Sequence, residues 1–270
     1  MSGERVVTII QSRVGSTRLP GKVLLPLGGR TVLERMLERV RSATRAGTVV
    51  VATTILPEDD QIARLCRDLK VLCFRGHPFD LLDRHIQTAR SIGADHVVKV
   101  PSDCPLIDPD AIDLVVNYYL DHTVDLDYVS NLHPASYPDG NDVEIMSLAA
   151  LEAAHAEATA QYEREHTTPF LWERPDRFRL GNVAWPTGRD CSLTHRYVLD
   201  YAEDYAVIRG VYETLSRTGP DFGCDAIVEF LDDLPVLAAL NARYRGSGWY
   251  VPPREPSRGT VPLREGACPS

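Results

Sequence analysis

The sequence predicts a single α/β domain built on a mostly parallel central sheet with helices on both faces. Short β-branched runs alternate with amphipathic segments through the first half of the chain, a pattern typical of a parallel sheet that is covered on both sides. With 270 residues, 44% of them hydrophobic, the chain can bury a full core. We therefore expect one domain over residues 1–245. The segment 246–270 is rich in proline and glycine and predicts a flexible tail.

The strands of the first half are predicted by four apolar runs bounded by polar segments. They are Val6 to Ile10, Thr48 to Thr53, Val71 to Phe74 and His96 to Val100.

Helices are predicted between these strands by their N-terminal signals. Thr31 and Glu34 form a capping-box pattern, and Asp80 and Asp108 are suited to cap two later helices. Pro109 favours the first helical position, where no backbone hydrogen bond is lost. We expect helices from about 32 to the mid-forties, from 58 to 69, from 81 to 89 and from 109 to 120.

The pattern changes after the expected short strand at 128–130. Prolines and glycines predict a loop, followed by a strand at 143–146 and an alanine-rich helix at 148–162. We interpret residues 131–170 as a small insertion or flap over the sheet, without a core of its own. A strand at 179–184 and helices at 201–216 and 225–242 are expected to complete the domain.

Composition excludes several classes of protein. A net charge of -9 and a pI near 5.4 argue against binding to nucleic acid or to an anionic membrane surface. No apolar run is long enough for a transmembrane helix, and no signal-peptide core precedes the first strand, which favours a cytoplasmic location. The six cysteines never occur as Cys-x-x-Cys, so we expect free thiols, with Cys104 a packing residue.

The loop after the first strand has the composition of a phosphate-binding site. Gly15 and Gly21 allow the backbone to approach an anion, and Arg13, Arg18 and Lys22 supply positive charge. The loop is not a Walker sequence, because the two glycines are six residues apart and a valine follows the lysine. A kinase or ATPase is therefore disfavoured, and a small phosphorylated ligand is expected.

Two carboxylates are candidates for a metal site. Asp103 directly follows the strand 96–100, at the carboxyl edge of the sheet, where open α/β proteins bind ligands. Mg²⁺ needs only one or two carboxylates when phosphates and water complete its shell, and we favour this role for Asp103 over that of a helix cap. Asp200 lies at the start of a predicted helix. The sequence explains it equally well as the N-cap of that helix and as a metal ligand.

Taken together, these segments resemble the spore-coat polysaccharide type of cytidylyltransferase, which is related to the acylneuraminate and 3-deoxy-manno-octulosonate cytidylyltransferases. The resemblance extends over residues 5–240. The residues that carry it are Gln-Ser-Arg-Val-Gly-Ser-Thr-Arg-Leu-Pro-Gly-Lys at 11–22, Ala-Thr-Thr at 52–54, Pro-Glu-Asp-Asp at 57–60, Phe-Arg-Gly at 74–76, Leu-Asp-Arg at 82–84, Asp-Cys-Pro-Leu-Ile-Asp-Pro at 103–109, Tyr-Pro-Asp-Gly-Asn-Asp-Val-Glu at 137–144, Arg-Glu-His-Thr-Thr-Pro at 164–169 and His-Arg-Tyr-Val-Leu-Asp at 195–200.

The resemblance implies a Rossmann-like fold of the GT-A type and a transfer of CMP from CTP to a sugar acid, with release of pyrophosphate. It implies Mg²⁺ held by Asp103 and Asp200, catalysis supported by Arg13, Arg18 and Lys22, and a homodimer with contacts in the 131–170 region. The nucleotide-binding residues that it implies are Gln11, Arg13, Gly15, Ser16, Arg18, Lys22, Thr53, Arg75 and Asp83, with Arg84 as further support.

The acceptor side of the pocket is expected in the segments 137–144 and 164–168, together with Arg196. Carboxylates there accept hydrogen bonds from sugar hydroxyls, and basic side chains bind an anionic group. The candidates are Tyr137, Asp139, Asp142, Glu144, Arg164, His166 and Arg196. Departures from the family pattern at Ser102 and at 197–202 leave the identity of the acceptor open.

Two other functions share part of this pattern. A glycosyltransferase of the same fold would use a nucleotide sugar, and a non-catalytic nucleotide-binding protein would bind CTP without turnover. Asp125 and Asp127 match the short Asp-x-Asp signature of glycosyltransferases, but they precede a strand and are interpreted as a loop and cap pair.

Overall fold

The computed structural model describes residues 4–217, 219 and 221–247. Of the tail expected at 246–270, only Gly246 and Ser247 lie within these residues, and the rest of that prediction falls outside them. No helix in the described part of the chain is long and apolar enough to cross a membrane.

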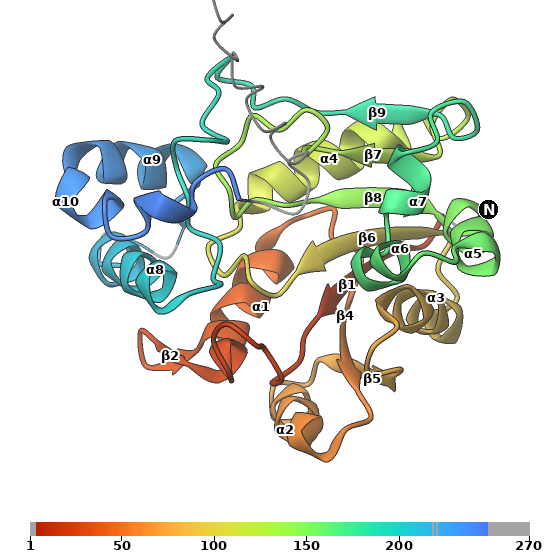
Figure 1. Ribbon diagram of the computed structural model, residues 1–270, viewed down its shortest axis with the longest axis horizontal. Coiled ribbons are helices and arrows are strands. Elements are labelled where there is room, and N and C mark those ends of the chain that lie inside the picture. Colours follow the sequence, from red (N-terminus) through yellow and green to blue (C-terminus); the bar gives the residue numbers. More distant parts are fainter. Residues whose placement is uncertain (1–3, 218, 220, 248–270) are drawn as a thin grey trace, which may run out of the picture.

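A seven-stranded sheet in the order β5-β4-β1-β6-β8-β7-β9 forms the centre of the molecule (Figure 1). Four strands are parallel and adjacent: β5 (Leu72–Gly76), β4 (Thr48–Thr54), β1 (Val6–Gln11) and β6 (His96–Pro101). β8 (Glu144–Ser147) runs antiparallel to β6, β7 (Tyr128–Ser130) antiparallel to β8, and β9 (Leu180–Asn182) parallel to β7. The predicted α/β class with a mostly parallel sheet is confirmed.

Helices pack on both faces of the sheet and bury separate apolar clusters. On one face lie α1 (Val32–Ser42), α2 (Asp60–Asp68) and α4 (Pro109–Leu120), with side chains such as Met36, Ile62 and Ile112 in the same cluster. On the other lie α3 (Leu81–Ile92), α5 (Leu148–Glu157) and α7 (Pro169–Trp172), whose cluster includes Ile86 and Leu151. The region expected to be an insertion thus supplies one sheet strand, β8, and the helices α5, α6 (Gln161–His166) and α7.

A third apolar cluster lies to one side of the sheet (Figure 1). It joins α8 (Ala202–Leu215) and α9 (Cys224–Asp233) to the β2–β3 hairpin, which is formed by Pro26–Leu27 and Arg30–Thr31. The remaining short helices are η1 (Lys22–Leu24), η2 (Pro57–Asp59), α10 (Pro235–Ala238) and η3 (Ala242–Tyr244).

The predicted helix starts are reproduced where a side chain caps the backbone. The Thr31 hydroxyl accepts from the Glu34 N–H, and the Glu34 carboxylate accepts from the Thr31 N–H. Asp80 and Asp108 accept from the backbone N–H groups of Asp83 and Asp110. These caps fix where α1, α3 and α4 begin, because they satisfy N–H groups that have no partner within the helix.

Two helices are shorter than the sequence predicts. The helix expected at 148–162 ends at Glu157, and α6 begins only after Ala160, whose N–H donates to Glu163. The helix expected at 225–242 ends at Asp233, because Pro235 disfavours a helical conformation of the preceding residue.

Candidate active site

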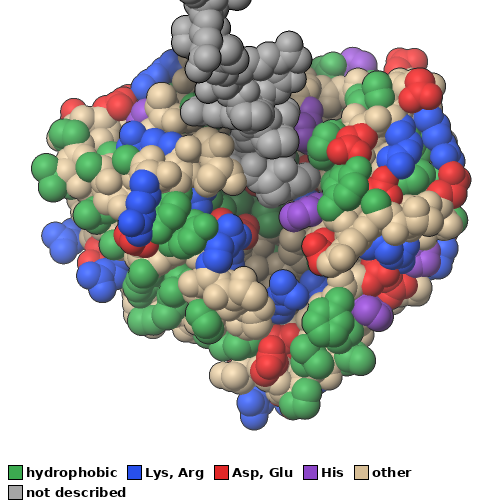
Figure 2. Space-filling view, in the orientation of Figure 1, with side chains coloured by type: hydrophobic (Ala, Val, Ile, Leu, Met, Phe, Trp, Pro, Cys, Tyr) green, Lys and Arg blue, Asp and Glu red, His purple; other side chains and the backbone are tan. Residues whose placement is uncertain are grey.

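A pocket of about 480 Å³ opens at the carboxyl ends of β1 and β6. Parallel strands bring their carboxyl ends to one sheet edge, so the loop after β1 faces the loop after β6 and the loops carrying Asp139 and Asp200. Figure 2 shows cationic and acidic side chains around the hollow on this face. The pocket is lined by Gln11, Ser12, Arg13, Ser16, Thr17, Arg18, Lys22, Pro78, Phe79, Leu81, Arg84, Lys99, Pro101, Ser102, Asp103, Asp139, Asp142, Glu165, His166, Arg196, Val198, Asp200 and Ser247.

Lys22 joins the two predicted metal carboxylates. Its Nζ lies 3.1 Å from Asp103 Oδ2 and 3.0 Å from Asp200 Oδ1, and it donates to the Leu199 carbonyl at 2.7 Å. Burial alone would lower the pKa of Lys22, but the two carboxylates outweigh burial and raise it. A charged ammonium group therefore sits between Asp103 and Asp200 in the ligand-free protein.

Asp200 is surrounded by three cations. Besides Lys22, the Arg18 guanidinium contacts Oδ1 at 2.7 Å and the Arg196 guanidinium contacts Oδ2 at 3.3 Å. Burial would raise the pKa of Asp200, yet these cations, Lys22 first among them, hold it below its usual value. Asp200 is therefore an ionised carboxylate, while half of the Arg18 side chain remains exposed to the pocket.

Arg196 is held rigidly beneath the pocket. Its guanidinium donates to Asp139 at 2.6 Å and to both carboxylate oxygens of Asp204 at 3.0 Å. Asp204 also accepts from the backbone N–H of Asp200, and Asn241 donates to Asp204. Only 3% of Arg196 is exposed, so this residue, expected to bind substrate, has its guanidinium engaged by carboxylates of the protein.

Lys99 and Glu144 form a buried ion pair on facing strands. They are paired in register across β6 and β8 and are only 3% and 1% exposed. Tyr128 donates to the second Glu144 oxygen at 2.6 Å. Glu144, expected to bind the acceptor, therefore contacts Lys99 and does not line the pocket, whereas Lys99 does. The sequence signal for Lys99 was a lone charge inside an apolar strand.

Asp142 and His166 give the same side of the pocket a neutral polar character. Burial, reinforced by Asp139 and Asp103, raises the pKa of Asp142 well above its usual value and thereby favours the neutral form of its carboxyl group. Burial, with Lys99 next in size, lowers the pKa of His166. A protonated carboxyl and a neutral imidazole both donate hydrogen bonds without adding charge.

We expect Asp142→Asn to be more stable than the wild type above pH 7. The raised native pKa means that the native state holds a proton that the unfolded state has lost, so the wild-type carboxyl weakens stability progressively as pH rises above about 4. The melting temperature of Asp142→Asn, measured relative to the wild type at the same pH, should therefore increase between pH 4 and pH 8. Thermal unfolding from pH 4 to pH 9 measures this; equal pH profiles for both proteins would contradict a protonated Asp142.

Several expected ligand residues lie outside the pocket, and the charged ones among them are already bound by groups of the protein. Arg75 donates to the Thr54 and Leu56 carbonyls and pairs with Asp60. The Asp83 carboxylate contacts the His155 imidazole, and the Arg164 guanidinium forms an ion pair with Asp80 at 2.5 Å. Thr53 is fully buried, Tyr137 packs against Trp185, and Gly15 lies beside Glu58.

Other pocket residues were not singled out as ligands by the sequence. Pro78 and Phe79 come from the segment between β5 and α3, and Leu81 is the first residue of α3. This segment carries no recognisable motif for such a role. Cys104 is fully buried and burial raises its pKa well above the usual value, in agreement with its expected packing role.

The two carboxylates fit a divalent cation only together with a polyphosphate. Within the described ranges, no group of three or more His, Cys, Asp or Glu side chains is arranged to hold a metal ion. Asp103 and Asp200 nevertheless lie close enough to share one ammonium group, and Mg²⁺ accepts two carboxylates when phosphate oxygens and water complete its shell. Lys22 would have to give up at least one of these contacts for the metal to bind.

Comparisons with known proteins give one consistent family. The model of the family described as Cytidylyltransferase matches residues 7–219. The spore coat polysaccharide biosynthesis protein SpsF of Bacillus subtilis is 28% identical over 238 residues, which cover 86% of this chain and 96% of that protein. A 3-deoxy-manno-octulosonate cytidylyltransferase of Geobacter sulfurreducens is 37% identical over 111 residues, covering 40% of this chain and 42% of that enzyme.

A solved structure extends the likeness to the whole fold. The structure of a cytidylyltransferase from Leptospira borgpetersenii has a TM-score of 0.82 and 32% sequence identity, and covers 87% of this chain and 97% of its own.

Proposed function

The chain belongs to the cytidylyltransferase family, and from this we propose that it transfers CMP from CTP to a hydroxyl group of a sugar acid or similar anionic acceptor and releases pyrophosphate. The observation that carries the proposal is the cluster in which Lys22 and Arg18 contact Asp200, while Lys22 also contacts Asp103. It combines phosphate-binding cations with metal-binding carboxylates at one edge of the sheet.

The cations of the loop after β1 are suited to bind the triphosphate of CTP. Arg18 and Lys22 are held at the pocket by Asp200, and Arg13 and Ser16 line the same wall. Phosphate oxygens compete for these donors, and guanidinium groups bind phosphate with two parallel hydrogen bonds. Positive charge fixed in this position stabilises the charge that appears on pyrophosphate as it leaves.

Asp103 and Asp200 are the residues that would hold Mg²⁺. When bound, Mg²⁺ neutralises phosphate charge and lowers the pKa of a coordinated hydroxyl group. Arg196 keeps the Asp200 carboxylate in place through Oδ2, and Asp204 holds the backbone N–H of Asp200. Transfer of Lys22 and Arg18 from Asp200 to phosphate oxygens would expose Asp200 Oδ1 as the nucleotide binds.

The opposite wall is suited to the acceptor. A neutral Asp142 carboxyl group and a neutral His166 imidazole can donate hydrogen bonds to sugar hydroxyl or carboxylate oxygens, and Lys99, paired with Glu144, lines the same pocket. An acceptor bound there would share the pocket with Asp103 and with the cations of the loop after β1.

Pyrophosphate release tests the proposal. The protein is incubated with Mg²⁺, each NTP in turn and a panel of sugar acids, and phosphate is measured after pyrophosphatase is added. We expect phosphate only with CTP and one acceptor class. Turnover of a nucleotide sugar without release of pyrophosphate would identify a glycosyltransferase. Binding of CTP without turnover of any acceptor in the panel would identify a non-catalytic nucleotide-binding protein.

We expect Lys22→Met to bind Mn²⁺ at least about tenfold more tightly than the wild type when no nucleotide is present. The variant removes an ammonium group that competes with a metal for Asp103 and Asp200, while the methionine fills a similar volume. Electron paramagnetic resonance titration of free Mn²⁺ measures the affinity. Arg64→Met, at an exposed position of α2, is the control, and equal Mn²⁺ affinity in all three proteins would contradict the metal assignment.

A further inference from the structure

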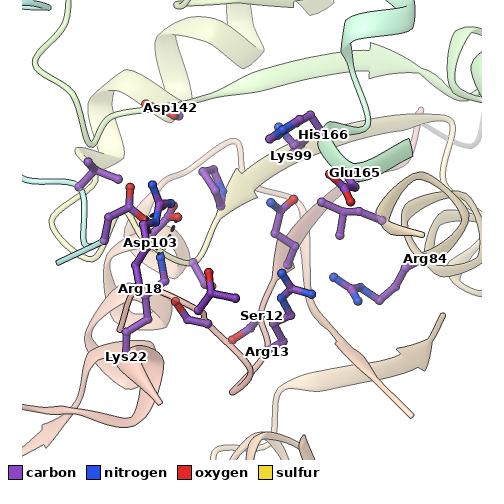
Figure 3. Close-up of a pocket in the computed structure, with 18 of the residues that line it drawn as sticks. Ser12, Arg13, Arg18, Lys22, Arg84, Lys99, Asp103, Asp142, Glu165 and His166 are labelled. Atoms are coloured by element: carbon purple, nitrogen blue, oxygen red, sulfur yellow. Dashed lines mark hydrogen bonds and ion pairs between the residues drawn. The ribbon is translucent and has the colours of Figure 1, made fainter. Parts of the chain in front are cut away.

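A segment late in the chain approaches the side of the pocket that carries the two proposed metal carboxylates. Figure 3 shows Arg18, Lys22 and Asp103 together on this side. The segment 241–247 follows α10, and its last residue lines the pocket. It lies outside residues 7–219, so the match of the family model assigns no role to it.

Asn241 is buried against the two residues that hold Asp200. Only 1% of Asn241 is exposed, and its Nδ2 donates to Asp204 Oδ1 at 2.8 Å and to the Arg196 carbonyl at 3.0 Å. Asp204 accepts from the backbone N–H of Asp200 at 3.0 Å, and the Arg196 guanidinium contacts Asp200 Oδ2 at 3.3 Å. One side chain therefore contacts both residues on which the position of Asp200 depends.

Arg196 is shared among three carboxylates, and its contact with Asp200 is the longest. The guanidinium lies 2.6 Å from Asp139 and 3.0 Å from Asp204, but 3.3 Å from Asp200. Asn241 gives Asp204 Oδ1 a neutral donor in addition to Arg196 Nε. Without Asn241, Arg196 would be the one donor left to this oxygen among the described residues, and Asp204 would compete more strongly with Asp200 for the guanidinium.

A second contact anchors the same segment beside Asp200. The Tyr244 ring stacks on the Tyr201 ring, with 3.8 Å between the ring centres and 5° between the planes. Tyr201 directly follows Asp200 in the chain, and the Arg18 guanidinium lies 5.3 Å from the centre of the Tyr201 ring. The segment 241–247 thus contacts the residue after Asp200 as well as the residues that hold its carboxylate and its backbone.

We propose that Asn241 is a positioning residue for the transfer reaction, which acts through Asp204 and Arg196 to keep the Asp200 carboxylate in place for the metal. The inference rests on the proposed function, because that function assigns Asp200 to Mg²⁺. Residues that orient a metal ligand typically change metal affinity or activity about tenfold or more when they are replaced. Loss of Asn241 should therefore affect the metal-dependent part of nucleotide binding and the rate of transfer.

The test compares Asn241→Ala with the wild type, both as the full chain. Calorimetry gives the CTP affinity with and without Mg²⁺, and steady-state rates give kcat and KM. We expect the affinity with Mg²⁺ and kcat each to fall by about tenfold, while the affinity without metal and the KM of the acceptor stay within about twofold. Unchanged kcat and unchanged affinity with Mg²⁺ overturn the proposal, as does an equal loss of CTP affinity with and without the metal.

A matched variant separates the role of Asn241 from general support of the segment. Arg245 donates to the Ala238 carbonyl at 2.6 Å and contacts neither Asp204 nor Arg196 within the described residues. Arg245→Met should keep the wild-type kcat and the wild-type response to Mg²⁺. A tenfold loss of kcat in Arg245→Met as well would assign the effect to the placement of the whole segment and overturn the role of Asn241.

Stability distinguishes positioning from a purely structural role. A folded Asn241→Ala protein that melts at a lower temperature, with the wild-type kcat and the wild-type response to Mg²⁺, overturns the proposal. If Asn241→Ala does not fold, Asn241→Ser decides by the same criteria.

Failure of this inference is separable from failure of the proposed function. Binding of CTP with Mg²⁺ requires no acceptor. A wild type that transfers no CMP, but loses metal-dependent CTP affinity on Asn241→Ala, would retain the positioning role and lose the proposed reaction. A wild type that transfers CMP equally well after Asn241→Ala would retain the reaction and lose the positioning role.

Discussion

Asp103→Asn is expected to lower the rate of CMP transfer by about a thousandfold while CTP binding measured without metal stays within a few-fold of the wild type. Asparagine keeps the shape of the side chain but removes the charge that would hold Mg²⁺. The nucleotide cations remain in place, because Lys22 keeps its contacts with Asp200 and the Leu199 carbonyl.

Single-turnover rates and calorimetric CTP affinity, measured on the same preparations, check this prediction. Asp110→Asn is the matched control, since Asp110 is exposed in the first turn of α4 and does not line the pocket. If Asp103→Asn kept wild-type activity, Asp103 would have no role in the reaction. Loss of CTP binding without metal would instead assign it to nucleotide recognition.

Arg196→Met is expected to lower the free energy of unfolding by about 3–5 kcal/mol. The guanidinium is buried among Asp139, Asp204 and Asp200, and methionine would leave these carboxylates without their shared cation. Removal of the Arg196 guanidinium should also lower the rate of CMP transfer, because Arg196 contacts Asp200 Oδ2. Arg196→Lys should recover only part of the stability, because one ammonium group cannot reproduce the guanidinium contacts to three carboxylates.

Urea unfolding of the two variants measures the effect. Arg209→Met serves as control, because Arg209 is exposed on α8, where it lies 3.7 Å from Glu213 and 6.0 Å from the centre of the Tyr205 ring, and its loss should change stability by less than about 1 kcal/mol. An Arg196→Met protein as stable as the wild type would show that the three carboxylates are not held by this residue.

Local signals in the sequence predicted much of the fold. The capping residues Thr31, Asp80 and Asp108 act within three residues of their own position, so their effect is visible without tertiary structure. The family resemblance is confirmed by the match over residues 7–219. Pro235 is a local signal that ends α9, whereas no proline or glycine marks the end of α5, where Ala158 is extended.

The site was harder to predict where long-range contacts decide which polar groups are available. Arg75 and Arg164 have the chemistry of anion ligands, yet backbone carbonyls and acidic side chains of the protein already bind them. Glu144 forms an ion pair with Lys99, which lies 45 residues earlier in the chain. The register of β6 and β8 places the two residues opposite each other. Arg84 differs from these residues, because it lines the pocket and pairs with no carboxylate among the residues that the structure describes.

Charge is therefore concentrated at the pocket of an otherwise acidic protein. The net charge of -9 gives no indication of Arg13, Arg18, Lys22 and Arg84 lining one cavity. Carboxylates pair with Lys22 and Arg18, whereas Arg13 and Arg84 form no ion pair within the described residues.

The most direct test of this account follows the α-phosphorus of CTP. The protein is incubated with Mg²⁺, a sugar acid and CTP labelled either at the α- or at the γ-phosphorus, and the products are separated. We expect the α-label in a CMP-linked sugar acid and the γ-label in pyrophosphate, in equal amounts, and neither product with Asp103→Asn. Recovery of the α-label only in unchanged CTP, across sugar acids to which the protein binds, would contradict a cytidylyl transfer at this site.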